Sequence, residues 1–386
     1  MKEIRFGIVG CGLVGRELAS AMARWIALVD FPARATLTAV CDTNEKLFDF
    51  FRAIPTVKLF TADYRELLRS PDVDAVYVAL PHHLHEQVYC DVIAAGKHLL
   101  GEKPFGIDRA ACERILKAQS PKSKIQNQVI RCSSEIPFFP GPQRIVQMIR
   151  DRAFGRILEV RASFLHSSDL DPNKPINWKR QTQFCGQAGV LNDLGMHPLH
   201  IPLRVGWKPK SLYAQLQKIF PERPDGKGGV AACDTWDNAI LHCNVETDPS
   251  TLLGTDGASF PMTIEAKRIA PGEMNTWSLE VLGTKSGVRY STKQPKTLWT
   301  FRPEKEQAWA TTDLGSQSVF PTVTGGIFEF GFSDAWVQML AAFVAEATGN
   351  LGDRFGCVTP QEALDAHRIY EAALRSHAEQ RVVKLP

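Results

Sequence analysis

Three polar side chains in two separate stretches of the chain could together move a proton and stabilise an alkoxide. Lys103 stands in a Glu-Lys-Pro stretch, and Asp193 and His197 stand four residues apart near the middle of the sequence. An ammonium stabilises developing negative charge on oxygen, and an imidazole beside a carboxylate takes a proton near neutral pH. Residues i and i+4 share one face of a helix, so we expect Asp193 and His197 on one helical face, with His200 near it. The pair could instead only stabilise its helix, and Lys103 could simply be solvated.

A glycine motif near the N-terminus indicates that a dinucleotide takes part in this chemistry. Gly10, Gly12 and Gly15 form a GxGxxG turn between an apolar stretch and a helical pattern. In that context the first glycine permits the tight turn, the second lets the backbone approach a pyrophosphate, and the third lets the helix lie close to its strand. The N–H groups at the start of the helix also favour an anion. The motif alone is a weak signal, because an ordinary strand–helix turn can carry the same glycines.

The acidic residue at the end of the second expected strand indicates which dinucleotide is bound. Asp42 can accept hydrogen bonds from ribose hydroxyls and would repel a 2′-phosphate. Thr43 and Asn44 follow it, with no arginine immediately behind to pair with that phosphate. We therefore expect NAD, with NADP less favoured. The spacing from Gly15 exceeds the usual interval of about 20 residues, and Asp42 could also cap the following helix.

A parallel α/β sheet is required to bring these residues together. From residue 4 to about residue 128, short apolar strands alternate with amphipathic helices, which is typical of a doubly wound parallel sheet. Ligands of such sheets bind at the carboxyl ends of the strands, so the Pro81–His85 and Glu102–Lys103 stretches should line the same crevice as the glycine turn. The expected strands are 5–10, 36–41, 59–60, 74–80, 98–102 and 125–130, and the expected helices are 14–28, 44–52, 64–70, 84–95 and 109–119.

The pattern changes after about residue 130. A helix at about 142–151 precedes strands in which apolar and polar residues alternate, which predicts a sheet with one face buried by helices and the other uncovered. We expect a Rossmann domain over residues 1–130 and a substrate-binding and oligomerisation α/β domain over residues 131–386, with a large open, mostly antiparallel sheet. The uncovered face predicts a homo-oligomer, a dimer or a tetramer. The expected strands are 158–164, 212–217, 238–245, 260–268, 277–282 and 287–291, and the last helices are 333–348 and 360–377.

Composition argues against several other classes of protein. The 386 residues carry a formal net charge of +3, and neither a block of like charges nor a basic stripe points to nucleic acid or to an anionic membrane. No apolar run approaches the ~18 residues of a membrane-spanning helix. The 9 cysteines are scattered without CxxC pairs, which favours reduced thiols in a cytoplasmic protein over a disulfide scaffold or a metal site.

The order of these motifs resembles the glucose–fructose oxidoreductase and inositol dehydrogenase family (Gfo/Idh/MocA) over nearly the whole chain. The motifs are GxGxxG, a strand-end Asp, Pro-x-x-x-His, Gly-Lys-His-x-x-x-Glu-Lys-Pro and Asp-x-Gly-x-His. The resemblance implies a Rossmann domain, a second α/β domain with a large open sheet, and NAD(P)-dependent oxidation of a small-molecule sugar, cyclitol or similar polyol. It implies that Lys103, Asp193 and His197 are catalytic. The expected cofactor contacts are Gly10, Gly12, Leu13, Val14, Asp42, Thr43, Leu80, Pro81, His82, His85, Glu102 and Lys103, and the expected substrate contacts are Arg131, Trp178, Lys179 and His200.

Three positions depart from the family pattern, and the reaction leaves alternatives open. His82 stands where asparagine is common, Lys179 where arginine is common and His200 where aspartate is common, which bears on the substrate more than on the reaction. The proton acceptor is His197, oriented by Asp193, or else Lys103 with a pKa lowered by burial. Two other functions fit this architecture: a redox-neutral enzyme that cleaves a glycoside, and a non-catalytic ligand sensor. Together the three catalytic candidates favour an enzyme over a sensor.

Overall fold

The computed structural model describes residues 2–119, 128–246, 259–304, 306–315 and 318–385, and the chain divides into two units. The first unit comprises the residues up to Phe138 together with Ser318–Pro360, and the second comprises Phe139–Gln317 with Gln361–Pro386. The sequence suggested one boundary near residue 130 and did not predict that a later segment returns to the first unit.

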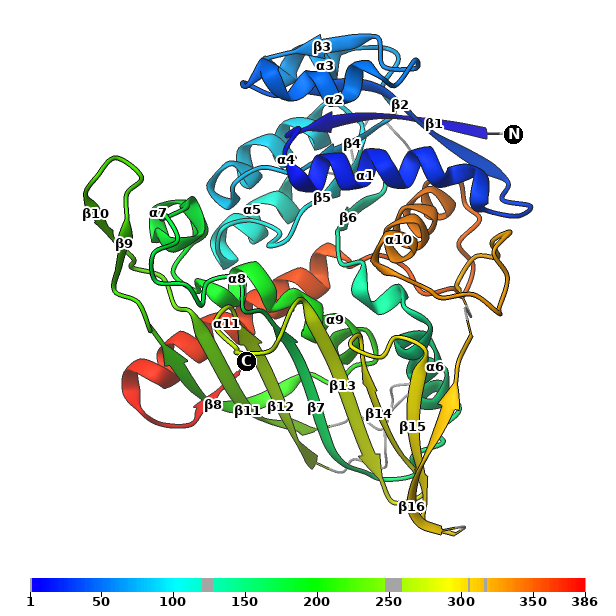
Figure 1. Ribbon diagram of the computed structural model, residues 1–386, viewed down its shortest axis with the longest axis vertical. Helices are drawn as coiled ribbons and strands as arrows, with labels where there is room; N and C mark the ends of the chain where they lie inside the picture. Colours follow the sequence, from blue (N-terminus) through cyan, green and yellow to red (C-terminus); the bar gives the residue numbers. More distant parts are fainter. Residues whose placement is uncertain (1, 120–127, 247–258, 305, 316–317, 386) are drawn as a thin grey trace. The chain divides into compact units, whose positions relative to one another are not determined.

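The first unit contains a six-stranded parallel sheet in the order β3-β2-β1-β4-β5-β6 (Figure 1). This is the doubly wound sheet that the alternating pattern predicts, and it brings the carboxyl ends of β1, β2, β4 and β5 to one edge. Residues 125–127 of the sixth expected strand lie outside the described residues. The strands are β1 (Lys2–Val9), β2 (Ala33–Cys41), β3 (Leu59–Thr61), β4 (Ala75–Val78), β5 (His98–Gly101) and β6 (Ile130–Cys132). The helices are α1 (Leu13–Ala23), η1 (Arg24–Ala27), η2 (Glu45–Leu47), α2 (Phe48–Arg52), α3 (Tyr64–Arg69), η3 (His82–Leu84), α4 (His85–Ala94), α5 (Arg109–Ala118) and η4 (Ile136–Phe138).

Helix α10 (Phe332–Ala347) belongs to this first unit although it lies far along the chain. Its residues from Ala335 to Ala345 are all buried, and its Phe343 ring lies 5.9 Å from the ring of Phe6 in β1. A helix that is apolar on every side is stable only when other elements surround it. The sequence predicted this helix but placed it in the second domain, because a hydrophobic pattern does not say which sheet will bury it.

The second unit is built on a sheet of nine strands within the described residues, in the order β16-β15-β14-β13-β7-β12-β11-β8-β17. In that part of the chain β7 pairs with β12 in parallel and the other neighbouring strands pair antiparallel, which confirms the predicted open, mostly antiparallel sheet. The strands are β7 (Ile157–Leu165), β8 (Pro209–Gln217), β11 (Asn238–Glu246), β12 (Ser259–Lys267), β13 (Thr276–Gly283), β14 (Gly287–Ser291), β15 (Thr297–Arg302), β16 (Glu306–Asp313) and β17 (Val383–Lys384).

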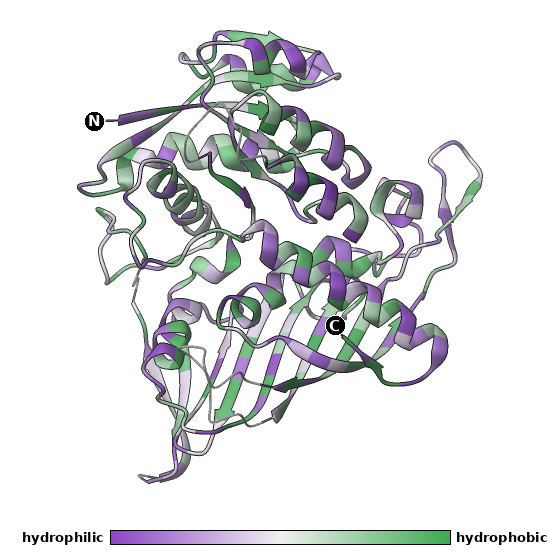
Figure 2. Ribbon diagram, turned by 180° about the vertical axis from the view of Figure 1, so that it is seen from behind, coloured by the Kyte–Doolittle hydropathy of each residue, from purple (hydrophilic) through white to green (hydrophobic). Residues whose placement is uncertain are grey.

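Helices cover one face of this sheet (Figure 2). Apolar and polar residues alternate along the strands, so that the buried residues face the helices. Helix α6 lies against β14, α8 against β11 and β12, and α9 against β7, β12 and β13. The helices of this unit are α6 (Pro140–Arg150), η5 (Trp178–Arg180), α7 (Thr182–Cys185), α8 (Val190–Leu194), α9 (Met196–Arg204) and α11 (Pro360–Glu379). Across the described residues of both units, no helix has the length and apolar character needed to cross a bilayer.

The sequence did not predict five short or terminal strands, which are β9 (Glu222–Pro224), β10 (Val230–Ala232), β15, β16 and β17. β15 and β16 form one edge of the large sheet, and the separate hairpin of β9 and β10 pairs only with itself within the described residues. Edge strands need little apolar alternation because they are half solvated, so their pattern is weak.

Candidate active site

The glycine turn leaves room for a ligand at one of its three glycines. Gly10 has φ +101°, and a Cβ there would lie 2.2 Å from the Ala79 carbonyl oxygen. A Cβ on Gly15 would lie 2.1 Å from the Gly10 carbonyl oxygen, so this glycine permits the close helix–strand contact. A Cβ on Gly12 would meet nothing within 4 Å. The open space at Gly12 is where the motif admits a pyrophosphate, so the turn fits a dinucleotide.

Helix α1 begins directly after this space. Gly12 is its N-cap without any side-chain cap, and its first turn holds no acidic residue. Leu13 is 68% exposed and Val14 is half-buried, as expected for the two residues at the mouth of the turn. The unsatisfied N–H groups and the helix dipole favour an anion at this end of the helix.

Asp42 lies at the end of β2, and both of its carboxylate oxygens accept backbone hydrogen bonds. Oδ2 accepts from the Cys11 N–H inside the glycine turn, and Oδ1 accepts from the Asn44 N–H, both at 2.8 Å. The following helix is capped by Asn44 instead of Asp42, since the Asn44 side chain accepts from the Lys46 N–H at 3.3 Å. A carboxylate has about four acceptor positions, so Asp42 can still accept from ribose hydroxyls. Thr43 follows it and is exposed.

His85 connects the ends of two neighbouring strands. Its Nδ1 lies 2.8 Å from the Pro104 carbonyl oxygen after β5, and its Nε2 lies 2.8 Å from the Leu80 carbonyl oxygen after β4. The ring is fully buried and stacks on Tyr89 at 4.9 Å. Burial lowers the pKa of His85, which opposes the imidazolium form that would donate to both carbonyls at once. His85 therefore holds the loops after β4 and β5 together beside the expected cofactor site.

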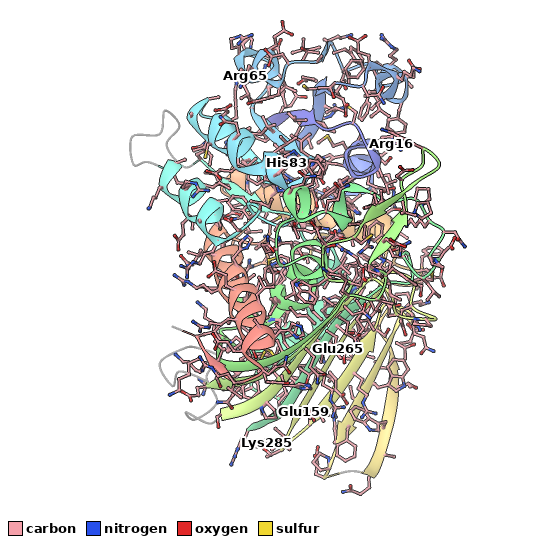
Figure 3. The ribbon with its side chains drawn as sticks, turned by 90° about the vertical axis from the view of Figure 1, so that its left-hand side faces the viewer. Arg16, Arg65, His83, Glu159, Glu265 and Lys285 are labelled. Atoms are coloured by element: carbon pink, nitrogen blue, oxygen red, sulfur yellow. The ribbon has the colours of Figure 1, made fainter. Side chains whose placement is uncertain are left out.

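Pro81 and His82 lie in the loop that His85 holds. Pro81 is half-buried, while His82 is 3% exposed with its ring centroid 5.5 Å from that of His85. His83, labelled in Figure 3, is exposed. The three consecutive positions therefore differ in how much of each residue a ligand could reach.

Glu102 is held at the end of β5 by buried hydroxyl groups. Its Oε1 accepts from the Tyr77 hydroxyl at 2.7 Å and from the Ser133 hydroxyl, and its backbone carbonyl accepts from the Tyr89 hydroxyl at 2.6 Å. Lys103 comes next and is half-buried, with a cis peptide bond to the following proline. These contacts fix the backbone from which the Lys103 ammonium extends.

Glu135 is a buried carboxyl near Glu102 and Lys103 that sequence reasoning did not single out. Burial and the neighbouring Glu102 charge raise its pKa to about 7, while Lys103 acts in the opposite direction. The stretch from Ser134 onward suggested only a crossing segment, and nothing in its sequence showed that Glu135 would lie beside the ends of β5 and β6.

Arg131 forms an ion pair within the first unit. Its guanidinium, in β6, donates to both carboxylate oxygens of Glu346 in α10, with a distance of 2.8 Å from Nε. Both side chains are 21% exposed. The expected substrate contact is therefore a side chain already engaged by a carboxylate, and its use by a substrate stays a prediction.

The sequence suggested that Asp193 and His197 lie on one continuous helix. In the second unit of the structure they lie on two helices. Asp193 is in α8 and His197 is in α9, and the two helices are separated at Gly195. Pro198 explains the interruption, because it lacks the N–H that would bond to the Leu194 carbonyl. Gly195 keeps helical dihedral angles (φ −65°, ψ −24°), so the backbone still advances about one turn between the two residues.

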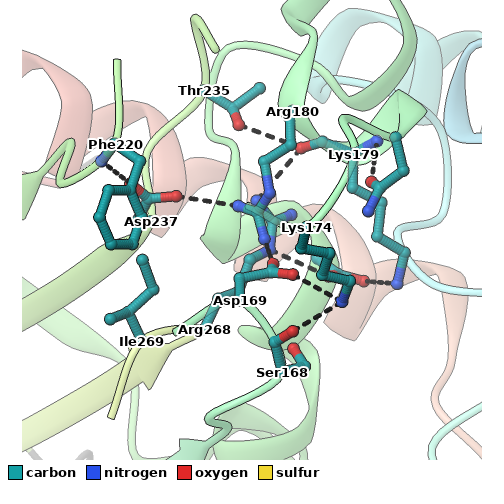
Figure 4. Close-up of polar contacts among 12 residues, drawn as sticks. Ser168, Asp169, Lys174, Lys179, Arg180, Phe220, Thr235, Asp237, Arg268 and Ile269 are labelled. Atoms are coloured by element: carbon teal, nitrogen blue, oxygen red, sulfur yellow. Dashed lines mark hydrogen bonds and ion pairs between the residues drawn. The ribbon is translucent and has the colours of Figure 1, made fainter. Parts of the chain in front are cut away.

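The Asp193 carboxylate is held between two cations. Oδ1 accepts from the Lys179 ammonium at 2.8 Å, and Oδ2 accepts from Arg268 Nε at 3.1 Å. The Asp193 and Arg268 side chains are 4% and 2% exposed, whereas Lys179 is 38% exposed. Figure 4 shows Lys179 and Arg268 within this polar cluster. Asp193 is thus fixed by charge pairing and stays close to a cation that solvent can reach.

The imidazole of His197 packs inside the second unit. It is 4% exposed, and its ring centroid lies 4.6 Å from that of Phe164 in β7. Its backbone carbonyl accepts from the Trp277 indole N–H at 3.0 Å. His200 is fully buried one turn later, with Nε2 3.4 Å from Arg204, which pairs with Glu362.

Trp178 and Lys179 lie together in η5. The Lys179 ammonium lies 5.6 Å from the centroid of the half-buried Trp178 ring. An aromatic face beside a charged donor can contact both the C–H face and the hydroxyls of a sugar ring.

The structure brings the expected site residues together in two groups. The expected cofactor contacts gather at the glycine turn and the ends of β2, β4 and β5, and Trp178, Lys179 and Asp193 gather at η5 and α8. Arg268, Glu346 and Glu135 also contact or lie near these residues, and no sequence pattern marks them, because an isolated charged residue does not show which distant residue it will pair with.

Comparisons with known proteins agree with this architecture. The chain matches the family described as "Oxidoreductase family, NAD-binding Rossmann fold" over residues 4–129 and the GFO/IDH/MocA C-terminal domain over residues 143–289. It is 25% identical to levoglucosan dehydrogenase of Pseudarthrobacter phenanthrenivorans over 86% of this chain and 83% of that protein. It is also 25% identical to scyllo-inositol 2-dehydrogenase (NADP(+)) IolU of Bacillus subtilis over 68% of this chain and 76% of that protein. A solved structure of levoglucosan dehydrogenase in complex with NADH superposes with a TM-score of 0.86 at 22% identity and 100% coverage of both chains.

Proposed function

Because this chain belongs to the Gfo/Idh/MocA family of oxidoreductases, we propose that it is an NAD-dependent dehydrogenase that oxidises a secondary hydroxyl of a sugar, cyclitol or related polyol. The observation that carries the proposal is the glycine turn with its open space at Gly12 and its 2.8 Å hydrogen bond to Asp42. This arrangement supports dinucleotide binding on one side of the reaction. Lys103, Asp193 and His197 supply the polar groups for the other.

The cofactor site would hold NAD through groups at four strand ends. The backbone at Gly12 and the first turn of α1 would take the pyrophosphate, and Asp42 would take the ribose hydroxyls. The Asp42 charge disfavours the 2′-phosphate of NADP. The nicotinamide ring of the bound cofactor would accept a hydride from the substrate carbon.

The protein's own groups would handle the proton and the charge on oxygen. His197 would take the proton of the substrate hydroxyl, because an imidazole is neutral and basic near pH 7. Lys103 would hold the same oxygen and stabilise its alkoxide character, and Asp193 would orient the surrounding groups. Lys103 is the alternative base, since a half-buried ammonium can have a lowered pKa.

The polyol class is supported by the residues at η5 and by the named relatives. The Trp178 ring beside Lys179 offers an aromatic surface and a hydrogen-bond donor, the pair of contacts that a neutral sugar ring uses. Levoglucosan dehydrogenase and scyllo-inositol 2-dehydrogenase act on levoglucosan and on scyllo-inositol, as their names state. We propose that this enzyme works in the cytoplasm.

We also propose that the uncovered face of the large sheet joins copies of the chain into a homo-oligomer, a dimer or a tetramer. A hollow of about 640 Å³ on this sheet is lined by residues that include Arg161, Glu265 (labelled in Figure 3), Trp299 and Trp309. Paired charges are among the lining residues, with Arg161 donating to Glu280 at 3.0 Å. Light scattering after size-exclusion chromatography tests this proposal, and a monomer over the accessible concentration range would contradict it.

A substrate screen tests the proposed activity directly. Inositols, aldoses and anhydrosugars are each incubated with NAD and, in parallel, with NADP, while NADH or NADPH absorbance and product formation are followed. Net NADH formation with at least one neutral polyol is expected. Product without net NADH would favour the redox-neutral alternative, and binding without turnover would favour the sensor.

A further inference from the structure

Arg268 occupies a central place in the second unit that none of the sequence motifs indicates. It follows β12 directly, and all five N–H groups of its guanidinium have acceptors. Nε donates to Asp193, Nη1 donates to the carbonyls of Lys179 (3.2 Å) and Trp236 (3.4 Å), and Nη2 donates to the Cys185 sulfur (3.6 Å) and the Gly189 carbonyl (3.4 Å). One buried side chain therefore joins η5, α7 and the start of α8.

Its partners are the groups that the proposed reaction uses. Arg268 bonds both the carboxylate of Asp193 and the backbone of Lys179, and the Lys179 ammonium closes the ring by donating to Asp193. The Lys179 carbonyl also accepts from the Thr235 hydroxyl at 3.0 Å. With its backbone and its charged end both fixed, Lys179 has little freedom to turn, although 38% of its side chain is exposed.

A second buried guanidinium nearby does a different job. Arg180, 1% exposed, pairs with Asp169 and, at 2.9 Å, with Asp237, and Lys174 also pairs with Asp169 (Figure 4). These contacts fasten the same segment to the sheet but do not reach Asp193. Arg180 and Arg268 are thus similarly buried, and Arg268 donates to the candidate catalytic carboxylate.

We propose that Arg268 is a positioning residue of the reaction, fixing the Asp193 carboxylate and the Lys179 ammonium in the geometry that the polyol substrate requires. The inference rests on the proposed function, because it assumes that Asp193 and Lys179 face the substrate. A planar guanidinium with five donors suits this role, whereas an ammonium can satisfy only part of the set. Arg268 itself is enclosed and does not touch the substrate.

The test compares substitutions at the two arginines. Arg268→Gln should lower kcat/KM for the polyol by about a hundredfold, mostly through a higher KM, and Arg268→Lys should recover part of the loss because it can still donate to Asp193. Arg180→Gln should lose comparable thermal stability but less than about tenfold in kcat/KM. The Kd for NADH, measured by fluorescence, should stay within about twofold in all three, since the cofactor contacts lie in the first unit. Equal losses of kcat/KM at the two arginines, or an Arg268→Gln enzyme with more than half of the original kcat/KM, would overturn the proposal.

Two provisions keep the result decisive. Should Arg268→Gln not fold, Arg268→Lys is compared with Arg180→Lys, and a loss of kcat/KM confined to Arg268→Lys supports the proposal, whereas equal values overturn it. Should the unmodified protein oxidise no polyol, the proposed function fails, and hydrogen exchange still tests the positioning. Faster exchange over residues 177–189 in Arg268→Lys than in Arg180→Lys supports it, and unchanged exchange overturns it.

Discussion

The two units hold their candidate site residues by different means. In the first unit, hydrogen bonds between side chains and the backbone dominate: Asp42 accepts from two N–H groups, and His85 lies between two carbonyls. In the second unit, buried ion pairs dominate, with Asp193 between Lys179 and Arg268. Backbone contacts follow from the fold of a strand–turn–helix unit, whereas ion pairs depend on particular side chains. We call the first unit the cofactor half and the second unit the substrate half. The cofactor half should therefore tolerate changes of side chain better than the substrate half.

The largest expected effect is the loss of the proposed base in the substrate half. His197→Ala should lower kcat by roughly 10²–10⁴-fold, the usual contribution of a general base, while the Kd for NADH changes little. Steady-state kinetics and NADH fluorescence titration measure the two quantities. His166→Ala is the control, because the His166 ring also packs on Phe164, at 4.9 Å. Equal loss in kcat and in NADH affinity would argue that His197 supports the fold instead.

Two glycine substitutions in the cofactor half distinguish the loss of space for the ligand from the loss of helix–strand packing. Gly12→Ala should fold normally, because the new Cβ meets nothing within 4 Å, but should weaken NAD binding by about tenfold or more as it enters the pyrophosphate space. Gly15→Ala should instead destabilise the protein by about 1–3 kcal/mol, since its Cβ would collide with a backbone oxygen. Calorimetric titration and thermal unfolding distinguish them. A Gly12→Ala protein that binds NAD as tightly as the original would refute the site.

Asp42 gives a smaller effect that bears on cofactor choice. Asp42→Ala should weaken NAD by about 1.5–3 kcal/mol, the range for hydrogen bonds to a charged group, and should narrow the preference for NAD over NADP. Asn44→Ala removes the neighbouring helix cap without the charge and serves as the control. Unchanged relative kcat/KM for the two cofactors would show that Asp42 does not contact the ribose.

The same contrast explains which parts of the molecule could be predicted from the sequence. The glycine turn, the parallel sheet and the strand-end Asp42 were predictable because each depends on residues close together in sequence. The Arg268–Asp193 pair joins residues 75 positions apart, and the Arg131–Glu346 pair joins residues 215 positions apart. No local pattern marks such partners, because the sequence around a single charged residue does not show whether that residue is solvated or buried in an ion pair.

Helix α10 and the Asp193–His197 stretch were mispredicted for related reasons. The apolar periodicity of α10 shows that it is buried but not that it returns to the first unit. The i, i+4 spacing of Asp193 and His197 predicts a shared face only in an unbroken helix, and Pro198 weighs against one. The proline is visible in the sequence, so this interruption could have been predicted.

The last expected effect concerns stability and not activity, and it is a pH dependence that the buried carboxyl of Glu135 in the first unit should produce. In the folded protein, burial and the charge of Glu102 raise the pKa of Glu135 from 4.5 to about 7. Between these two values the folded chain keeps a proton that the unfolded chain has released, so stability should fall as pH rises through this window and stay low above it. The loss in free energy of unfolding attributable to Glu135 is at most about 3 kcal/mol.

Urea unfolding of the wild type and of Glu135→Gln across this pH window measures the loss. Glutamine cannot titrate, so the stability of Glu135→Gln should lack this dependence on pH. Parallel curves for wild type and Glu135→Gln would mean that the Glu135 carboxyl is already ionised in the folded protein, stabilised by the nearby Lys103 charge.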